Sequence, residues 1–292
     1  MKLCSVLLSL FAVVAPSLAQ QPGKPVSLGR NQPLRSGTEL RESLRLAVEG
    51  GETRIEAKST TRQLSTRWIH RYTLVRRIQG GGSEEVEVRD HVCETGNFPA
   101  GAMPPPAETF GPLANKSLKV RKRAVGSEFV LKEGKPKPAE TSCLADLGFL
   151  SGLLELLPAA IGTQPRKIGE TWTTKVQNPR GKAYGLPVLK DLEATLGSVE
   201  ERDGDSYAHV LVSGSFAMQR PLGYNATIEV TFAAQLTRRL SDMLDVEMKV
   251  TGRFKNSYPS MVSFSDNAPA EPATFVQDFP YTLTRTLRLE SK

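Results

Sequence analysis

Apolar and polar residues alternate with a period of two over many stretches of this chain. Such alternation is typical of β-strands with one buried face and one solvated face. The stretches lie at residues 40–48, 66–77, 86–92, 192–199, 207–216, 228–234, 244–250 and 281–289. Turn residues between them, such as Asp203-Gly204-Asp205, favour antiparallel hairpins. We therefore predict a mainly β (α+β) fold, an antiparallel curved sheet or half-open β-barrel of about ten to twelve strands.

One segment, residues 141–157, has the spacing of an amphipathic helix instead. Its apolar residues recur every three or four positions, at Cys143, Leu144, Leu147, Leu150, Leu153, Leu154 and Leu157. We expect the helix to begin after Pro138, with Glu140 and Thr141 as capping partners, and to end at Pro158. The favoured interpretation is a helix packed in the concavity of the sheet. A lid over a ligand cavity and a helix on a membrane surface are the alternatives.

The first 19 residues have the pattern of an export signal. Lys2 precedes a short apolar run, and Ser17 and Ala19 are the small residues that a signal peptidase requires. The run is too short to cross a bilayer of about 30 Å, which takes about 20 residues, so we expect no retained transmembrane segment. The prediction is therefore an exported protein, either periplasmic or secreted.

After the signal peptide, residues 1–19, we expect a flexible segment, residues 20–36, and then a β-rich domain, residues 37–292. The domain is either one unit or two halves, residues 37–136 and 163–292, joined by the predicted helix. All-β units of about 200–250 residues are ordinary, so length does not decide between the two.

Charge and motifs narrow the functional class only slightly. The formal net charge of +7 is a mild excess that favours anionic surfaces. The sequence has no Gly-x-Ser-x-Gly elbow, no His-Glu-x-x-His helix, no phosphate loop and no dinucleotide fingerprint. We therefore expect no enzymatic activity and no cofactor. A hydrolase whose residues converge from distant strands is the less favoured alternative.

Two cysteines, Cys93 and Cys143, remain once the signal peptide is removed. An even pair tends to form a disulfide in an oxidising compartment, and this bridge would stabilise the fold by roughly 4 kcal/mol. Two separate buried thiols are the alternative.

The chain has three histidines, His70, His91 and His209. His91 and Cys93 lie two positions apart on one strand face, where two metal ligands can converge. No partner pair with ligand spacing accompanies them, so we expect no metal site but solvated polar residues on this strand face, with Cys93 in a bridge. A site formed by His91, Cys93 and a distant histidine is the alternative.

Aromatic residues recur at every second position in Trp68, His70 and Tyr72, with arginines beside them. Core packing is the favoured interpretation, and a surface for lipid, glycan or nucleic acid is the alternative. Because the chain is predicted to be exported, we expect no nucleic-acid partner. A basic run over residues 116–123 would suit an acidic partner.

The stretch after the predicted helix carries Leu156-Leu157-Pro158 and then Ile168-Gly169-Glu170-Thr171-Trp172. This resembles a pattern in a broad group of exported bacterial β-rich proteins without an assigned function. In that group a leucine-rich helix ends at a proline, and a Val/Ile-Gly-Glu/Asp-x-Trp turn leads into antiparallel strands. The resemblance covers roughly residues 140–250 and implies an exported β-sheet protein, with no chemistry attached. By its residue type, Trp172 is a buried anchor or, alternatively, a ligand-stacking surface.

We predict from these observations a non-enzymatic binding or carrier module for an apolar or lipid-like ligand. Six residues are expected to line its cavity: Trp68, Tyr72, Leu147, Leu150, Leu154 and Trp172. The alternative is a structural or protein-interaction module of the cell envelope, with an envelope protein as partner. A sizeable apolar cavity beside Leu147, Leu150 and Leu154 would favour the carrier, and a solid interior would favour the interaction module.

Overall fold

The computed structural model describes residues 23–29, 34–58, 60–80, 83–100, 109–122, 127–175, 188–189, 191–219, 227–264 and 269–290. The predicted signal peptide lies outside the described residues. In the described part of the chain, thirteen strands form one antiparallel sheet beside a single helix, α1 (Pro138–Ile161). None of the helical residues described is part of a segment long and apolar enough to span a membrane. The predicted fold class, a mainly β curved sheet with one helix, is confirmed.

The strands follow the alternating stretches of the sequence and extend most of them. They are β1 (Glu39–Ala57), β2 (Thr61–Ile78), β3 (Glu84–Pro99), β4 (Thr109–Phe110), β5 (Lys116–Lys122), β6 (Ser127–Leu131), β7 (Thr171–Thr174), β8 (Val188–Leu189), β9 (Leu192–Arg202), β10 (Asp205–Gln219), β11 (Thr227–Arg239), β12 (Leu244–Val262) and β13 (Glu271–Leu289). The two-residue connection between β9 and β10 has positive φ at both positions, 54° at Asp203 and 81° at Gly204. This is the backbone that a tight hairpin requires, as predicted.

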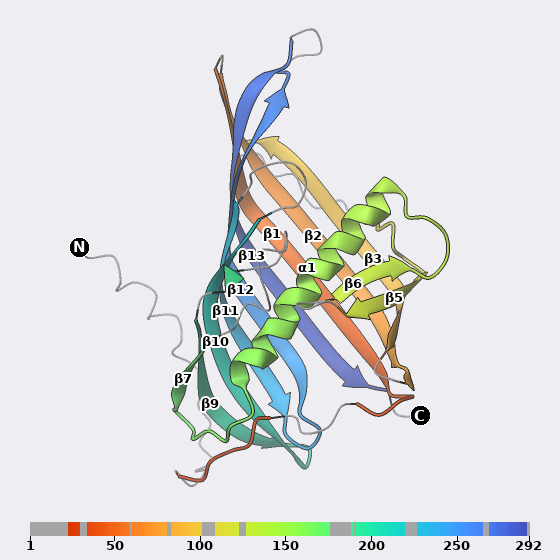
Figure 1. The fold of residues 1–292 in the computed structure, drawn as a ribbon, viewed down its shortest axis with the longest axis vertical. Coiled ribbons are helices and arrows are strands. Elements are labelled where there is room, and N and C mark those ends of the chain that lie inside the picture. Colours follow the sequence, from red (N-terminus) through yellow and green to blue (C-terminus); the bar gives the residue numbers. More distant parts are fainter. Residues whose placement is uncertain are drawn as a thin grey trace, which may run out of the picture.

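The first and last long strands pair with each other. β1 lies between β2 and β13, so the strand order is β6-β5-β3-β2-β1-β13-β12-β11-β10-β9-β7. The path ends at β6 and β7 without closing, and the sheet curves around α1 (Figure 1). Residues from both sides of α1 in the sequence therefore contribute to one continuous sheet.

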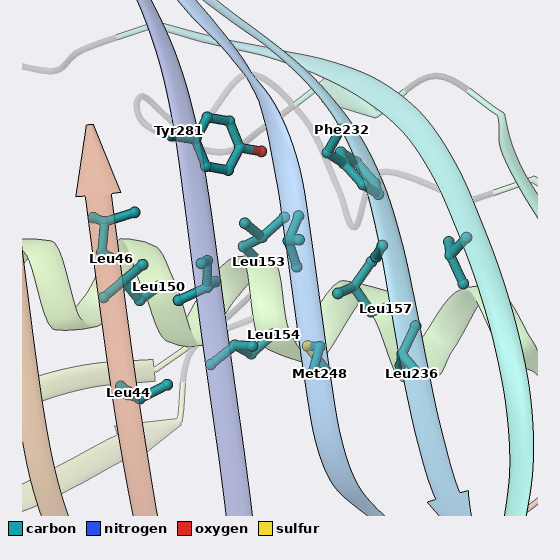
Figure 2. Close-up of a cluster of buried hydrophobic side chains, with 14 of the residues drawn as sticks. Leu44, Leu46, Leu150, Leu153, Leu154, Leu157, Phe232, Leu236, Met248 and Tyr281 are labelled. Carbon is teal, nitrogen blue, oxygen red and sulfur yellow. The ribbon is translucent and has the colours of Figure 1, made fainter. Parts of the chain in front are cut away.

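The leucines of α1 fill the concavity of the sheet. Leu147, Leu150, Leu153 and Leu157 are at most 2% exposed. Figure 2 shows α1 leucines opposite side chains from β1, β11, β12 and β13, including Leu46, Leu236 and Met248. Burying each such leucine stabilises the fold by about 1.5–3 kcal/mol. The prediction that the helix packs in the concavity is confirmed.

The N-terminus of α1 is capped by a side chain of its own first turn. The helix begins at Pro138, and the backbone N–H of Lys137 donates to Oε2 of Glu140 at 2.7 Å. Lys116 of β5 also forms an ion pair with Glu140 at 3.3 Å. The predicted role of Glu140 as a capping partner is confirmed.

The C-terminus of α1 corrects a prediction, because the helix passes through Pro158 and ends at Ile161. A proline inside a helix removes one backbone hydrogen bond. Ala160 and Ile161 are fully buried, so the packing of the last turn against the sheet outweighs that loss. The carbonyl of Ala160 accepts hydrogen bonds from Trp172 Nε1 at 3.0 Å and from the Thr174 hydroxyl at 2.8 Å, which satisfies a carbonyl at the helix end.

Part of the segment that we expected to be flexible is fixed on the folded unit. Val26 and Arg166 exchange two backbone hydrogen bonds, at 2.7 and 2.8 Å. Leu28 is fully buried, and its carbonyl accepts a hydrogen bond from Arg238. Residues 23–29 therefore belong to the packed structure.

Candidate functional site

A cleft of about 620 Å³ lies between the C-terminal half of α1 and the end of the sheet where β1 begins and β13 ends. Its apolar lining consists of Leu34, Leu40, Ile78, Leu154, Pro158, Met243, Leu244 and Leu287. Its charged lining consists of Glu42, Arg76, Glu84, Glu155, Arg238, Asp245 and Arg285. We call it the helix–sheet cleft. Its volume falls in the range of small-molecule sites, roughly 300–1,000 Å³.

Glu42 lies fully buried in this cleft between two arginines from neighbouring strands. Arg76 of β2 and Arg285 of β13 each donate from Nε to one oxygen of the Glu42 carboxylate, both at 2.5 Å. Arg76 also donates from Nη1 to Glu84 of β3 at 2.7 Å. The ionic network therefore joins four adjacent strands, β3, β2, β1 and β13.

Two opposing effects set the protonation of Glu42. Burial raises the pKa of a carboxyl group, but the charges and hydrogen bonds of Arg76 and Arg285 outweigh burial here and hold the pKa of Glu42 below its ordinary value of 4.5. The carboxylate is therefore charged at neutral pH. Removing one partner would leave a buried charge uncompensated.

A second buried ion pair borders the cleft on the β11–β12 side. Arg238 donates from Nε and Nη2 to the two oxygens of Asp245, at 2.7 and 2.9 Å. On the helix side, the hydroxyls of Ser127 and Ser151 donate to Oε1 of Glu155 at 2.8 and 3.1 Å. These contacts fix the polar groups of the cleft in place.

The chemistry of the cleft suits binding. Each of its three arginines has a carboxylate partner, and the described lining has four carboxylates in all. A ligand would therefore meet no net positive charge. The described lining contains no histidine and no cysteine.

The sequence contains a pattern that indicates this ionic network, namely charged residues at apolar positions of the alternation. Glu42, Arg76 and Arg285 each occupy the apolar parity of their strand. Their neighbours on that parity are Leu40 and Leu44, Leu74 and Ile78, and Leu283 and Leu287. A charged residue between two buried apolar positions indicates a buried ion pair, because an isolated buried charge is too costly to retain. Which strands are adjacent follows only from the sheet order.

The six residues predicted to line one cavity do not line a common cavity among the pockets described. Leu154 lines the helix–sheet cleft. Leu147 and Leu150 are each 1% exposed and do not line this cleft. Tyr72 is buried in the same core, and Trp68 packs against it half-buried. The cleft thus lies at one end of α1, away from the buried Leu147 and Leu150.

Trp172 is the buried anchor that its residue type favoured. It is 7% exposed, and its indole N–H donates to Ala160 at the end of α1. The guanidinium of Arg166 lies 4.6 Å from its ring centroid. The ring is therefore covered on this side by the protein itself.

The predicted disulfide is not formed, since Cys93 and Cys143 are both free thiols. Cys93 is half-buried on β3, with its sulfur 3.9 Å from the hydroxyl of Thr109. Cys143 is buried on α1, and its sulfur lies within 4.8 Å of a ring nitrogen of His70 and of His91. The structure also groups His91 with Cys143 rather than with Cys93, the partner that the sequence suggested.

Comparison with models of known protein families gave no match. Comparison with curated proteins gave no match either. The function is therefore inferred from the geometry of the helix–sheet cleft and from the export pattern of the sequence.

Proposed function

We propose that the protein is an exported, non-enzymatic binding or carrier module that holds an amphiphilic ligand in the helix–sheet cleft. The observation that carries the proposal is the cleft of about 620 Å³, which apolar and charged side chains line together. Export to the periplasm or the cell exterior rests on the pattern of the first 19 residues.

The apolar part of the ligand would lie against the leucines of the cleft. Leu40, Leu244 and Leu287 form a small buried cluster of their own on one side, and Leu154 of α1 lies on the other. Burial of an apolar chain between these surfaces supplies a free energy of about 25 cal/mol per Å².

The charge of the cleft restricts the polar part of the ligand. The described lining has three arginines and four carboxylates, and the arginines are already paired. An anionic head group would have to compete with Glu42 and Asp245 for these arginines. We therefore propose a ligand with an apolar chain and a neutral or cationic polar group.

Binding of the neutral fluorescent probe N-phenylnaphthylamine tests the proposal. We expect saturable binding of one probe per chain, weakened about tenfold or more by Ile78→Trp, which places a large ring in the cleft. Ile69→Trp is the matched control, because Ile69 is a half-buried residue of the same strand on the opposite face. A dansylated fatty acid should bind more weakly than the neutral probe. No saturable binding, or equal loss in both variants, would contradict the proposal.

A protein-interaction module of the cell envelope is the second candidate function. The burial of Leu147 and Leu150, which do not line the cleft, favours it. Affinity purification of the tagged chain from its own envelope, followed by mass spectrometry, tests this candidate. Stoichiometric recovery of one envelope protein, together with a mature chain free of small ligand in native mass spectrometry, would favour interaction over carriage.

A further inference from the structure

His70 of β2, His91 of β3 and Cys143 of α1 meet beneath the N-terminal half of the helix. Each is at most 6% exposed. One ring nitrogen of each histidine and the sulfur of Cys143 all lie within 4.8 Å of one another. None of the three lines the helix–sheet cleft. The cluster is therefore a separate feature of the molecule.

Sheet register and one close backbone approach position the two histidines. In the β2–β3 ladder, His70 pairs with Cys93 and Tyr72 pairs with His91. The rings of Tyr72 and His91 stack with centroids 4.3 Å apart. Gly111 packs so closely on His91 that a Cβ at Gly111 would lie 2.2 Å from its Nδ1. The ring of His91 is thus held from both sides.

The hydrogen bonds determine which ring nitrogen of each histidine carries the proton. The backbone N–H of Leu113 donates to Nδ1 of His91 at 3.2 Å, so the neutral His91 ring carries its proton on Nε2. That proton is donated to Nδ1 of His70 at 3.2 Å, and the hydroxyl of Tyr72 lies 3.1 Å from the same nitrogen. The proton of His70 is therefore on Nε2. This buried nitrogen has no hydrogen-bond partner among the described residues.

An unpartnered ring nitrogen in a closed interior is unusual and points to a ligand. Burial lowers the pKa of both histidines to about 4, so both rings are neutral at physiological pH. Neutral imidazole and sulfur are the donors that zinc and copper ions prefer.

We propose that His70, His91 and Cys143 bind one transition-metal ion of borderline or soft character, Zn²⁺ or a copper ion. Zinc bonds of roughly 2.0–2.1 Å to nitrogen and 2.3 Å to sulfur require the three side chains to draw together by small rotations. Cys143 binds as a thiolate and releases its proton to solvent. On His70 the ion takes the unpartnered Nε2, and the ring proton moves to Nδ1, which lies 3.1 Å from the hydroxyl of Tyr72. Asp146 and Cys93 both lie within electrostatic reach of Cys143.

Metal binding would also break a hydrogen bond between Leu113 and His91. A metal ion on Nε2 of His91 displaces the ring proton to Nδ1, which then faces the N–H of Leu113. The present hydrogen bond between Leu113 and His91 has to break. Metal binding at this nitrogen should therefore shift the Leu113 amide resonance and speed its hydrogen exchange.

Titration of the reduced, metal-free mature chain with Zn²⁺ and Co²⁺ tests the proposal. We expect one ion per chain and a thiolate-to-cobalt charge-transfer band in the near ultraviolet. Cys143→Ser and His70→Gln should weaken binding by about 100-fold or more. His209→Gln is the matched control, since His209 lies on β10 beside Glu200, outside the cluster, and its loss should leave affinity unchanged.

Several results would overturn the proposal. They are no stoichiometric binding by the unmodified chain, full affinity in Cys143→Ser, or equal loss in His209→Gln. Circular dichroism checks that the variants fold. If a variant does not fold, the cobalt spectrum of the unmodified chain tests the site by itself. Absence of the thiolate-to-cobalt band would then refute the site. A mature chain isolated two hydrogens lighter than its reduced form would also refute it, because a Cys93–Cys143 disulfide removes the thiolate.

Discussion

Arg285 donates a hydrogen bond of 2.5 Å from its Nε to the carboxylate of Glu42, although 243 residues separate the two in the chain. Glu42 lies near the start of β1 and Arg285 near the end of β13, and these strands are neighbours in the sheet. The contact joins the two ends of the folded chain within the helix–sheet cleft.

Replacing Glu42 with glutamine should lower the free energy of unfolding by about 3–5 kcal/mol, because Arg285 would lose its carboxylate partner and Arg76 would lose one of its two carboxylate partners, Glu42 and Glu84. Urea denaturation measures the change. Glu49→Gln is the control, since Glu49 is an exposed residue of the same strand with an ion pair of 3.6 Å to Arg45. Its effect should stay within about 1 kcal/mol. Equal losses in the two variants would contradict the role given to Glu42.

The same network should make stability depend on acid pH. The pKa of Glu42 is lower in the folded chain than its ordinary value of 4.5. Its contribution to stability is therefore complete above the unfolded pKa and is lost as the pH falls through the folded pKa. The stability difference between the unmodified chain and Glu42→Gln should narrow when unfolding is measured from pH 6 down to about pH 3. A difference that stays constant over this range would refute the linkage.

Leu150→Ala should destabilise the protein by about 2–5 kcal/mol, because it opens a cavity where α1 packs on the sheet. Leu150 is 1% exposed and lies opposite β1 and β13 in Figure 2. Leu211→Ala on β10 serves as the comparison, since Leu211 is 49% exposed and its truncation should cost about 0.5 kcal/mol or less. Thermal unfolding followed by circular dichroism distinguishes the two.

Gly111→Ala should destabilise the chain by about 1–3 kcal/mol, because the new Cβ would overlap the ring of His91. Gly80→Ala is the matched control, since a Cβ at Gly80 would meet nothing within 4 Å. Unfolding curves of the two variants, with histidine ring resonances as a second readout, measure the effect. Unchanged His91 resonances in Gly111→Ala would show that the ring has room to move.

The individual elements could be predicted from sequence because their signals are local. Alternation marked one face of β1 through Leu40, Leu44 and Leu46, and the spacing of leucines marked the buried face of α1. The prediction that the helix ends at Pro158 was wrong, because the tendency of proline to end a helix describes a helix without tertiary contacts. In the folded chain, burial of Ala160 and Ile161 extends the helix by one more turn.

The candidate sites depend on contacts that no local pattern contains. His91 has the parity of Glu85, Glu87 and Arg89, the polar face of its strand, but a register shift between Val88 and Asp90 turns its ring into the core. Alternation also could not place Cys143 beside it, because the docking of α1 is decided by the whole concave surface. The pairing of β1 with β13 likewise brings Glu42 to Arg285 only once every intervening strand has taken its position. The sequence by itself determined the elements and their apolar faces, and only the tertiary structure decided which buried residues meet and that the charged Glu42 is buried among them. The physical reason is that the apolar face of an element follows from its local pattern, whereas contacts and the burial of a paired charge depend on the packing of the entire sheet.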